Sequence, residues 1–205
     1  MLNGIHWLGH ASFRVELGGM VIYIDPWKLK NPIPADLVLI THDHHDHLSD
    51  ADVIKISKPG TVILCAAKGI GKLHGDVRAV KPGLTLQLGE ALVQTVPAYN
   101  VSTVFHPLKA EYVGYILTVA GMSIYHAGDT DLIPEMAGIV CDIALLPIGG
   151  TYTMDAVDAA KALSVIKVKV AVPMHWGDLV GSRKDADLFV KLAPPGVQVT
   201  LLEPE

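Results

Sequence analysis

Charged residues, aromatic residues and cysteines are all scarce in this chain. Of its 205 residues, 18% are Asp, Glu, Lys or Arg, 6% are Phe, Trp or Tyr, and two are cysteines. An average globular domain carries about 25% charged residues. Two cysteines, Cys65 and Cys141, cannot build a disulfide framework, so we expect both thiols to be buried and structural. Half of the residues are apolar, and a chain of this length can bury a core without such cross-links.

Basic character and long apolar runs are missing as well. The formal net charge is −5 and the pI is near 6.0, so a nucleic-acid partner held by a basic surface is not expected. No apolar run of the sequence approaches the roughly 18 residues that a membrane span needs. Met1–His6 lacks the basic head and apolar stretch of a secretory signal. We therefore expect a cytoplasmic protein that acts on a small molecule without a membrane partner, and the sequence leaves open whether it forms a homo-oligomer.

Short apolar segments between turn residues predict mostly β structure. The first 25 residues are expected to form strands: Ser12–Leu17 alternates apolar and polar residues, Gly18-Gly19 is a hairpin signal, and Met20–Ile24 runs back. The run 36–41 is typical of a strand buried on both faces. Further strands are expected at Thr61–Cys65, Leu92–Val96, Tyr112–Val119, Met122–His126, Ile143–Leu146, Val170–Met174 and Val197–Leu201, and helices at Ser49–Ser57, Asp155–Ile166 and Lys184–Leu192. These elements predict a single α/β domain over residues 1–205, with two packed sheets and helices outside.

Histidine is unusually abundant, and its distribution indicates a metal site. The chain has ten histidines, and four of them fall in the six residues His42–His47, together with Asp43 and Asp46. This segment closely follows an apolar run, so it is expected to leave a sheet at the end of a strand, where functional loops lie. Imidazole nitrogens and carboxylate oxygens are the ligands that Zn²⁺ and similar ions prefer. A solvated loop would explain a lone histidine, but this density favours a metal site.

The spacing of these residues leads to a family. His42-x-His44-x-Asp46-His47 resembles the signature of the metallo-β-lactamase fold superfamily. Gly128-Asp129-Thr130 and Pro173-Met174-His175 are similar to the later aspartate and the last histidine of that superfamily. Four further segments are similar to the small metal-dependent hydrolases that include ascorbate-6-phosphate lactonase: residues 7–13, 24–26, 125–130 and 146–154. The likeness runs in matching order from about residue 4 to residue 175.

The resemblance implies an αββα four-layer sandwich, with two mixed β-sheets face to face and helices outside. It also implies a site for two divalent metal ions at one edge, with Asp129 lying between the ions. The other implied ligands divide between a first and a second ion: His42 and His44 with a third histidine, and Asp46, His47 and His175. Zn²⁺ is the ion we expect first, and Mn²⁺ or Fe²⁺ is compatible with the same ligands.

The sequence departs from the family at the third ligand of the first ion. Relatives place a histidine directly after a Pro-Ala-aromatic segment, but here Pro97-Ala98-Tyr99 is followed by Asn100. Either Asn100 fills this place weakly, or His106 reaches in from the loop. We favour His106 because imidazole binds these ions far better than a carboxamide. Pro107 restricts the backbone of His106 toward extended geometry, and the loop from Asn100 to Pro107 is expected to form one wall of the substrate pocket.

Several other polar residues have competing interpretations. Asp25 precedes Pro26, and we expect it to close a loop by a hydrogen bond near the site rather than to bind metal. His45 occupies a variable position of the motif and is expected to point away. His126 is either an outer partner that orients Asp129 or a core residue.

The reaction that the resemblance implies is hydrolysis by a metal-activated water at a dinuclear site. The expected substrate is a small ester, lactone or phosphodiester, and Asp46 or a nearby histidine is expected to move a proton. His10 lies between two predicted strands, where we favour a substrate contact or proton donor over a turn histidine. Two alternatives remain at this point: a di-iron redox protein of the same fold, and a metal-binding module without catalysis. The fold alone does not decide among them.

Overall fold

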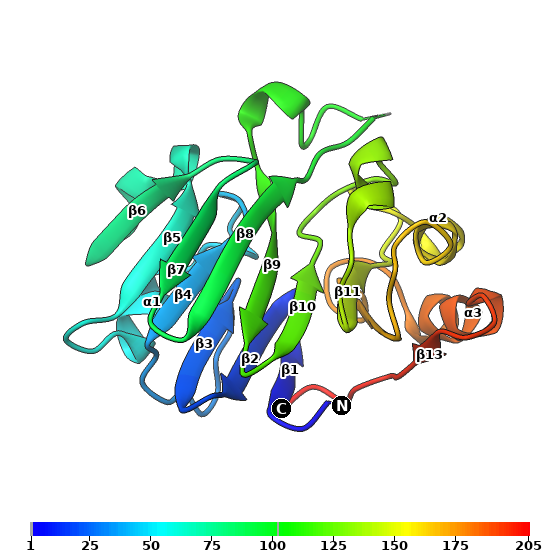
Figure 1. Cartoon of the computed structure of the whole chain (residues 1–205). Helices are drawn as coiled ribbons and strands as arrows, with labels where there is room; N and C mark the ends of the chain where they lie inside the picture. The colour runs from blue at the N-terminus through cyan, green and yellow to red at the C-terminus, as the bar shows by residue number, and fades with distance from the viewer. Residues whose placement is uncertain (1, 102) are drawn as a thin grey trace.

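Two mixed β-sheets packed face to face form the centre of the molecule in the computed structural model, which describes residues 2–101 and 103–205 (Figure 1). The first sheet has the strand order β1-β2-β3-β4-β5-β6. Its strands are β1 (Ile5–Gly9), β2 (Ser12–Leu17), β3 (Met20–Ile24), β4 (Leu37–Ile40), β5 (Val62–Ala66) and β6 (Asp76–Val80). Strands β1 to β3 pair antiparallel and β3 to β6 pair parallel.

The second sheet has the order β13-β12-β11-β10-β9-β8-β7. Its strands are β7 (Thr85–Leu88), β8 (Ala91–Pro97), β9 (Val113–Val119), β10 (Met122–His126), β11 (Ile143–Pro147), β12 (Val170–Met174) and β13 (Gln198–Val199). Strands β7 to β10 pair antiparallel and β10 to β13 pair parallel. Both sheets therefore place parallel strand ends, where βα loops begin, at one edge of the sandwich.

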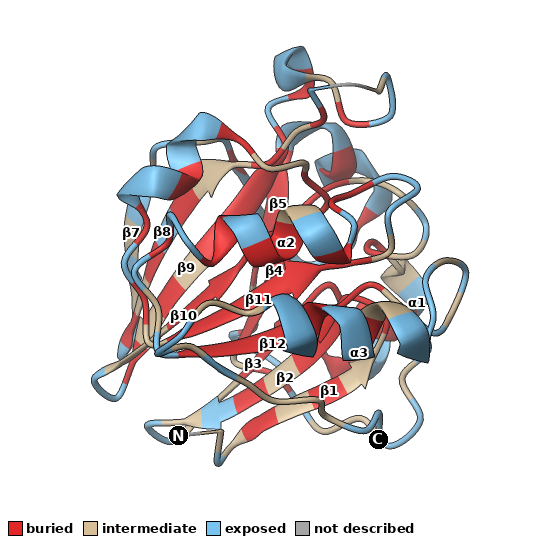
Figure 2. Ribbon diagram, turned by 90° about the vertical axis from the view of Figure 1, so that its right-hand side faces the viewer, coloured by how far each residue is buried: buried red, intermediate tan, exposed pale blue. Residues whose placement is uncertain are grey.

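Three α-helices lie outside the sheets, and each begins at a polar cap. They are α1 (Asp50–Ile56), α2 (Ala156–Ala162) and α3 (Arg183–Leu192). Ser49 caps α1, Asp155 caps α2, and Ser182 forms a capping box with Asp185 at α3. Helix α1 packs on the first sheet, and Figure 2 shows α2 and α3 across the second sheet with their exposed sides outward. This order of layers confirms the predicted αββα architecture.

Alternation along the strands separates the core into two parts. Ile22, Ile24 and Leu39 face the second sheet and join the large cluster between the sheets. Tyr23 and Val38, one residue along, face the opposite side and join the cluster under α1. Successive side chains of a strand point to opposite faces. The continuous apolar runs of β3 and β4 thus reflect burial on both sides.

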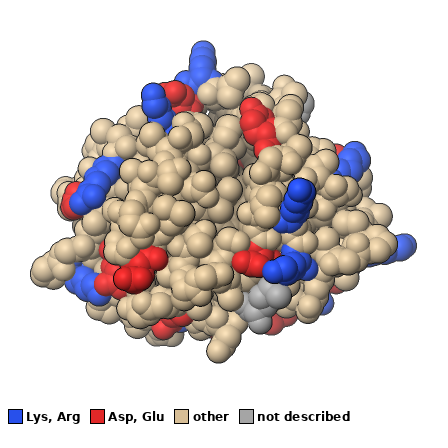
Figure 3. Space-filling model, viewed as in Figure 1, with Lys and Arg blue, Asp and Glu red and all other residues tan. Residues whose placement is uncertain are grey.

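The predicted elements that lie near the centre of the fold are confirmed, and the differences lie at the edges. Strands β6 and β7 were not predicted, and β13 has two residues where a longer strand was expected. Short 3₁₀ turns at Ala67–Lys72, Leu108–Ala110 and Pro134–Gly138 were also not predicted. Within the described residues, no helix has the length and apolar character that crossing a membrane requires. Charged side chains of both signs are scattered over the face in Figure 3, with broad uncharged areas between them.

Candidate metal centre

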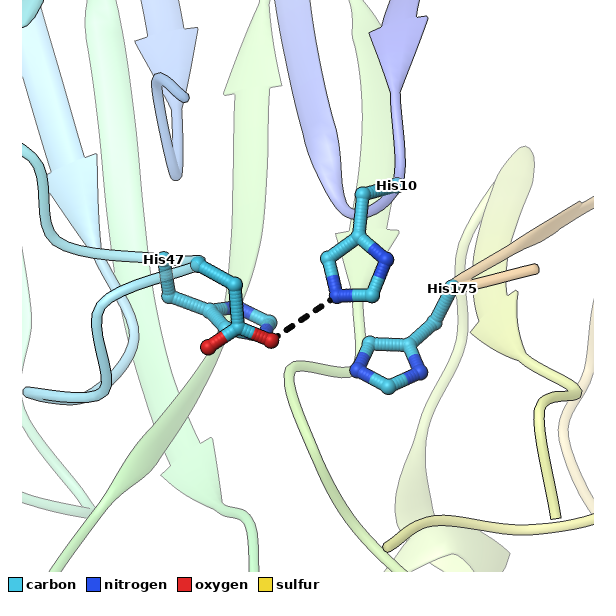
Figure 4. Close-up of side chains that lie close together, drawn as sticks. His10, His47 and His175 are labelled. Carbon is cyan, nitrogen blue, oxygen red and sulfur yellow. Dashed lines mark hydrogen bonds and ion pairs between the residues drawn. The ribbon is translucent and has the colours of Figure 1, made fainter. Parts of the chain in front are cut away.

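Segments from both sheets bring histidine and aspartate side chains together at one edge of the sandwich. The first sheet supplies His10 from the β1–β2 turn and the segment 42–47 after β4. The second sheet supplies His106 from the β8–β9 connection, Asp129 after β10 and His175 after β12. Figure 4 shows His10, His47 and His175 pointing toward one another from three separate segments. The convergence expected from the sequence is therefore present.

Three histidines form a first group whose ring nitrogens face one another. His44 Nδ1 lies 3.1 Å from His42 Nε2 and 3.1 Å from His106 Nε2. The other ring nitrogens of His42 and His106 face away, toward Thr41 and Asn100. A lone pair on each facing Nε2 is therefore aimed at one spot, and a shared cation relieves their repulsion. The donor set fits a divalent transition metal.

A second group surrounds His47 and also has donor atoms that can converge on one ion. The ligand atoms of His10, Asp46, His47 and His175 all lie within 4.8 Å of one another. Among the described residues, His47 Nε2 and both ring nitrogens of His175 are buried without a hydrogen-bond partner. Buried polar atoms without a hydrogen-bond partner are rare in folded proteins, and a bound cation would satisfy these nitrogens. Both groups thus fit metal ions.

Asp129 lies between the two groups. Its Oδ2 is 3.2 Å from His175 Nε2 and 3.6 Å from His106 Nε2, and its Oδ1 is 3.2 Å from His47 Nε2. Gly128 makes this placement possible, because a Cβ there would meet Val113 O at 3.0 Å and its φ is +66°. The carboxylate therefore reaches both histidine groups from a single strand end.

Burial and neighbouring charges shift the pKa values of the residues in this centre in opposite directions. Burial would raise the pKa of Asp129, but the charges on His175 and His47 hold that pKa well below its usual value. Burial would lower the pKa of His47, but Asp129 and Asp25 raise it well above the ordinary value. Burial lowers the pKa of His106 to about 4. The side chain of His106 is therefore neutral near pH 7, as metal binding requires.

Asp25 orients histidines of both groups without facing the centre itself. Its Oδ2 accepts hydrogen bonds from His47 Nδ1 at 2.7 Å and from Thr41 Oγ1 at 2.7 Å. Thr41 Oγ1 in turn accepts from His42 Nδ1 at 2.9 Å. In the neutral form of His42 and His47, these bonds place the ring proton on Nδ1, so that each Nε2 would be free to bind metal. The expected hydrogen-bonding role of Asp25 is confirmed, although no local pattern indicated its link to His42 through Thr41.

Removing the Thr41 hydroxyl is expected to weaken the first histidine group. Thr41→Val deletes the acceptor for His42 Nδ1 at similar side-chain volume, so metal affinity should fall by roughly 10- to 100-fold. Thr41→Ser keeps the hydroxyl and is the matched control. Competition with a chromophoric chelator measures both affinities, and equal losses in the two variants would contradict the role of the hydroxyl.

Asn100 holds His106 in place. Its Oδ1 accepts from His106 Nδ1 at 2.8 Å and from the His106 backbone N–H at 3.1 Å. Its Nδ2 donates to Tyr152 O at 2.8 Å and to Asp131 Oδ1 at 2.9 Å. The carboxamide is thus occupied by these partners, while the imidazole of His106 faces the other two histidines. The assignment of His106 as a ligand stays a prediction that this geometry favours.

The other histidines singled out in the sequence, His10, His45 and His126, have three different surroundings. His10 Nε2 donates to Asp46 Oδ2 at 3.0 Å (Figure 4, dashed line). The side chain of His45 is 80% exposed and belongs to neither histidine group, but it lines the pocket above them, so it does not point fully away as expected. His126 is buried in the core, where its Nε2 donates to Ala11 O at 2.8 Å, and its Nδ1 accepts from the Gly128 N–H at 3.2 Å, so it also holds the backbone next to Asp129. The catalytic role of His10 stays a prediction.

Strained backbone is concentrated at this edge. His10, Asp25 and His175 all have positive φ, at 51°, 46° and 59°. The left-handed region costs a non-glycine residue of order 1 kcal/mol or more, and such residues cluster at functional sites. The His175 backbone N–H also donates to His10 O at 2.9 Å. This bond joins an end of the first sheet to an end of the second.

A pocket of about 370 Å³ opens above the two groups. Its floor includes His44, Asp46, His106 and Asp129. Its walls come from three loops and include Phe105, Tyr152, Leu179 and Val180. Phe105 and His106 thus line the pocket from the loop that was expected to form a wall, although Ser102 of that loop lies outside the described residues.

Comparisons with known proteins show the family to which the chain belongs. A family model for the β-lactamase superfamily domain matches residues 4–175. A UPF0173 metal-dependent hydrolase from Methanopyrus kandleri is 35% identical, over 98% of this chain and 96% of the relative. The crystal structure of a candidate metal-dependent hydrolase from Parabacteroides distasonis has a TM-score of 0.87 and 34% identity, covering 98% of this chain and 93% of that chain. A metallo hydrolase from Ignicoccus hospitalis has a TM-score of 0.78 and 28% identity, covering 98% and 94%. The chain belongs to the β-lactamase superfamily, within the UPF0173 family of metal-dependent hydrolases.

Proposed function

We propose that this protein is a hydrolase with two divalent metal ions and a small-molecule substrate. The single observation that carries the proposal is the Asp129 carboxylate within 3.6 Å of both His106 and His175, which belong to different histidine groups. The residues that would hold the ions are those that converge at this edge: His42, His44, His106, Asp129, Asp46, His47 and His175. Zn²⁺ suits these ligands best, and Mn²⁺ or Fe²⁺ is compatible with them.

The ions would supply an acidified water and would polarise a carbonyl or phosphoryl oxygen of the substrate. Asp46 is the residue suited to move the proton, because it lines the pocket and is partly exposed. Burial would raise the pKa of Asp46, but the hydrogen bond from His10 and the charge on His47 lower it well below its ordinary value. His10 thereby keeps the carboxylate ionised and fixed in position. The position of Asp46 in the pocket, rather than its lowered pKa, supports a role in accepting a proton, and His10 is the residue that positions it.

Metal content and turnover together test the proposal. The protein reconstituted with Zn²⁺ is expected to hold two ions per chain and to hydrolyse at least one of a lactone, an aryl ester and a phosphodiester. Chelation should abolish turnover, and added metal should restore it. Bound metal without turnover of any of these substrates would support a binding module, and iron with redox activity would support the di-iron alternative.

A further inference from the structure

The walls of the pocket differ chemically from its floor. Phe105, Tyr152 and Leu179 are 48%, 37% and 57% exposed, although such side chains are ordinarily buried. The rings of Phe105 and Tyr152 meet edge to face with centroids 4.7 Å apart. These apolar groups stand together at the mouth of a site whose floor is polar. Contiguous exposed apolar surface of this kind marks a binding site.

The described residues that line the pocket include no lysine and no arginine. Proteins usually recognise phosphate and carboxylate groups with such cations. Lys28, on a neighbouring loop, is engaged elsewhere, because its Nζ lies 2.6 Å from Asp178 Oδ2 and 3.9 Å from the centre of the Trp27 ring. Apart from the metal-binding groups, the described lining offers an anionic substrate only the imidazole of His45, whose Nδ1 already lies 3.7 Å from Asp46 Oδ1.

Leu179 lies at the rim of the pocket in a backbone conformation that leucine disfavours. Its φ is 65°, a conformation in which glycine or asparagine is much less strained. The turn that holds it is tied down on both sides, since the Val180 N–H donates to Asp178 O at 2.8 Å and Asp178 pairs with Lys28. Gly149 leaves room for this turn, because a Cβ there would lie 2.7 Å from Val180 Cγ2. An exposed, strained leucine at a pocket mouth indicates a functional contact.

We propose that the substrate is an uncharged ester or lactone whose apolar group lies against Phe105, Tyr152 and Leu179. This inference rests on the proposed hydrolase function and narrows its substrate class by excluding phosphodiesters. In the reaction, the bond between the acyl carbon and the alcohol oxygen breaks. Water supplies a hydroxyl to the acyl carbon and a proton to the alcohol oxygen, and the resulting acid ionises by releasing a proton.

Aryl esters that differ only in acyl chain length, or only in a terminal carboxylate, test the apolar wall and the preference for uncharged substrates separately. For the zinc-reconstituted protein, kcat/KM is expected to rise about threefold for each methylene from 4-nitrophenyl acetate to butyrate to hexanoate. The mono-4-nitrophenyl ester of adipic acid has the same chain length as the hexanoate but ends in a carboxylate. It is expected to react at least tenfold more slowly than the hexanoate, because its charge would lie on the apolar wall.

Substitutions of Leu179 test whether this side chain causes the preference for long, uncharged acyl groups. Asparagine tolerates positive φ, and Leu179→Asn is expected to remove most of the rise in kcat/KM with acyl chain length. Leu179→Lys is expected to reduce the difference in kcat/KM between the adipate ester and the hexanoate ester. Ile54→Asn is the matched control, since Ile54 is 55% exposed on α1. That variant should behave as the wild type does.

A second readout needs no turnover. Methyl signals of Leu179 in the metal-free protein are expected to shift when 4-nitrophenyl hexyl ether is added, while those of Ile54 stay unchanged. A flat chain-length series, a preference for bis(4-nitrophenyl) phosphate or unshifted Leu179 signals would overturn this inference and leave the hydrolase function intact. Absence of turnover with every ester and phosphodiester would overturn both.

Discussion

Asp129→Asn is expected to remove one of the two proposed metal ions and nearly all turnover. The substitution keeps the size of the side chain but removes the charge that lies between the two histidine groups, 3.2 Å from both His175 and His47. Two cations held close together repel each other unless an anion lies between them. The loss in kcat/KM should exceed the roughly 100-fold that removal of an outer hydrogen-bond partner causes. Metal analysis and steady-state kinetics measure the two effects.

His45→Ala provides the control for the register of the motif. Its imidazole stands between two proposed ligands in the sequence but is 80% exposed, so its removal should leave the metal content at two ions per chain. Thermal unfolding of both metal-free variants separates loss of metal from loss of fold. Equal loss of metal in the two variants would show that the motif residues are assigned in the wrong register.

Loss of the His106 imidazole is expected to remove the ion of the first group at limiting metal. Zinc sites in catalysis usually have three protein ligands and an open position, and His42 with His44 supplies only two histidines. Asn100→Ala should act more mildly, with roughly 10- to 100-fold weaker binding, because it removes the acceptor that orients His106 and not the ligand. Side-by-side metal content of His106→Ala and Asn100→Ala measures this difference.

A larger loss of metal from Asn100→Ala than from His106→Ala would change the assignment of the third ligand. If Asn100→Ala loses metal while His106→Ala keeps it, the carboxamide is the third ligand. Unfolding of the metal-free variants again serves as the control, since Asn100 Nδ2 also joins its loop to Tyr152 O at 2.8 Å. A His74→Ala variant, which changes an 80% exposed histidine far from the motif in sequence, should match the wild type in metal content.

Local patterns were sufficient for the centre of the fold and failed at its edges. Strands β4 and β11 are buried at every position, and burial on both faces produces the apolar runs that the sequence displays. Strand β6 is mostly exposed and β7 is exposed at alternate positions. Their sequences therefore carry little apolar signal, and only pairing with a neighbouring strand reveals them. Edge strands are defined by tertiary contacts more than by their own composition.

The residues of the candidate site also differ in whether the sequence could reveal them. Residues 42–47 could be singled out because several ligands stand close together in one segment, and Asp129 and His175 through their resemblance to a family. The partners of Asn100 lie 6, 31 and 52 residues away, so no local spacing could indicate that it holds His106. The same applies to Asp25, whose acceptor role joins Thr41 and His47 only after β3 and β4 pair side by side.

Because the centre is divided between the two sheets, the proposed metal ions would cross-link the sandwich. His42, His44 and His47 belong to the first sheet, whereas His106, Asp129 and His175 belong to the second. Neither sheet alone can assemble either complete set of ligands, so the free energy of metal binding is available only when the layers are docked. Bound metal therefore opposes separation of the layers, and unfolding of the two sheets becomes more cooperative as the metal concentration rises.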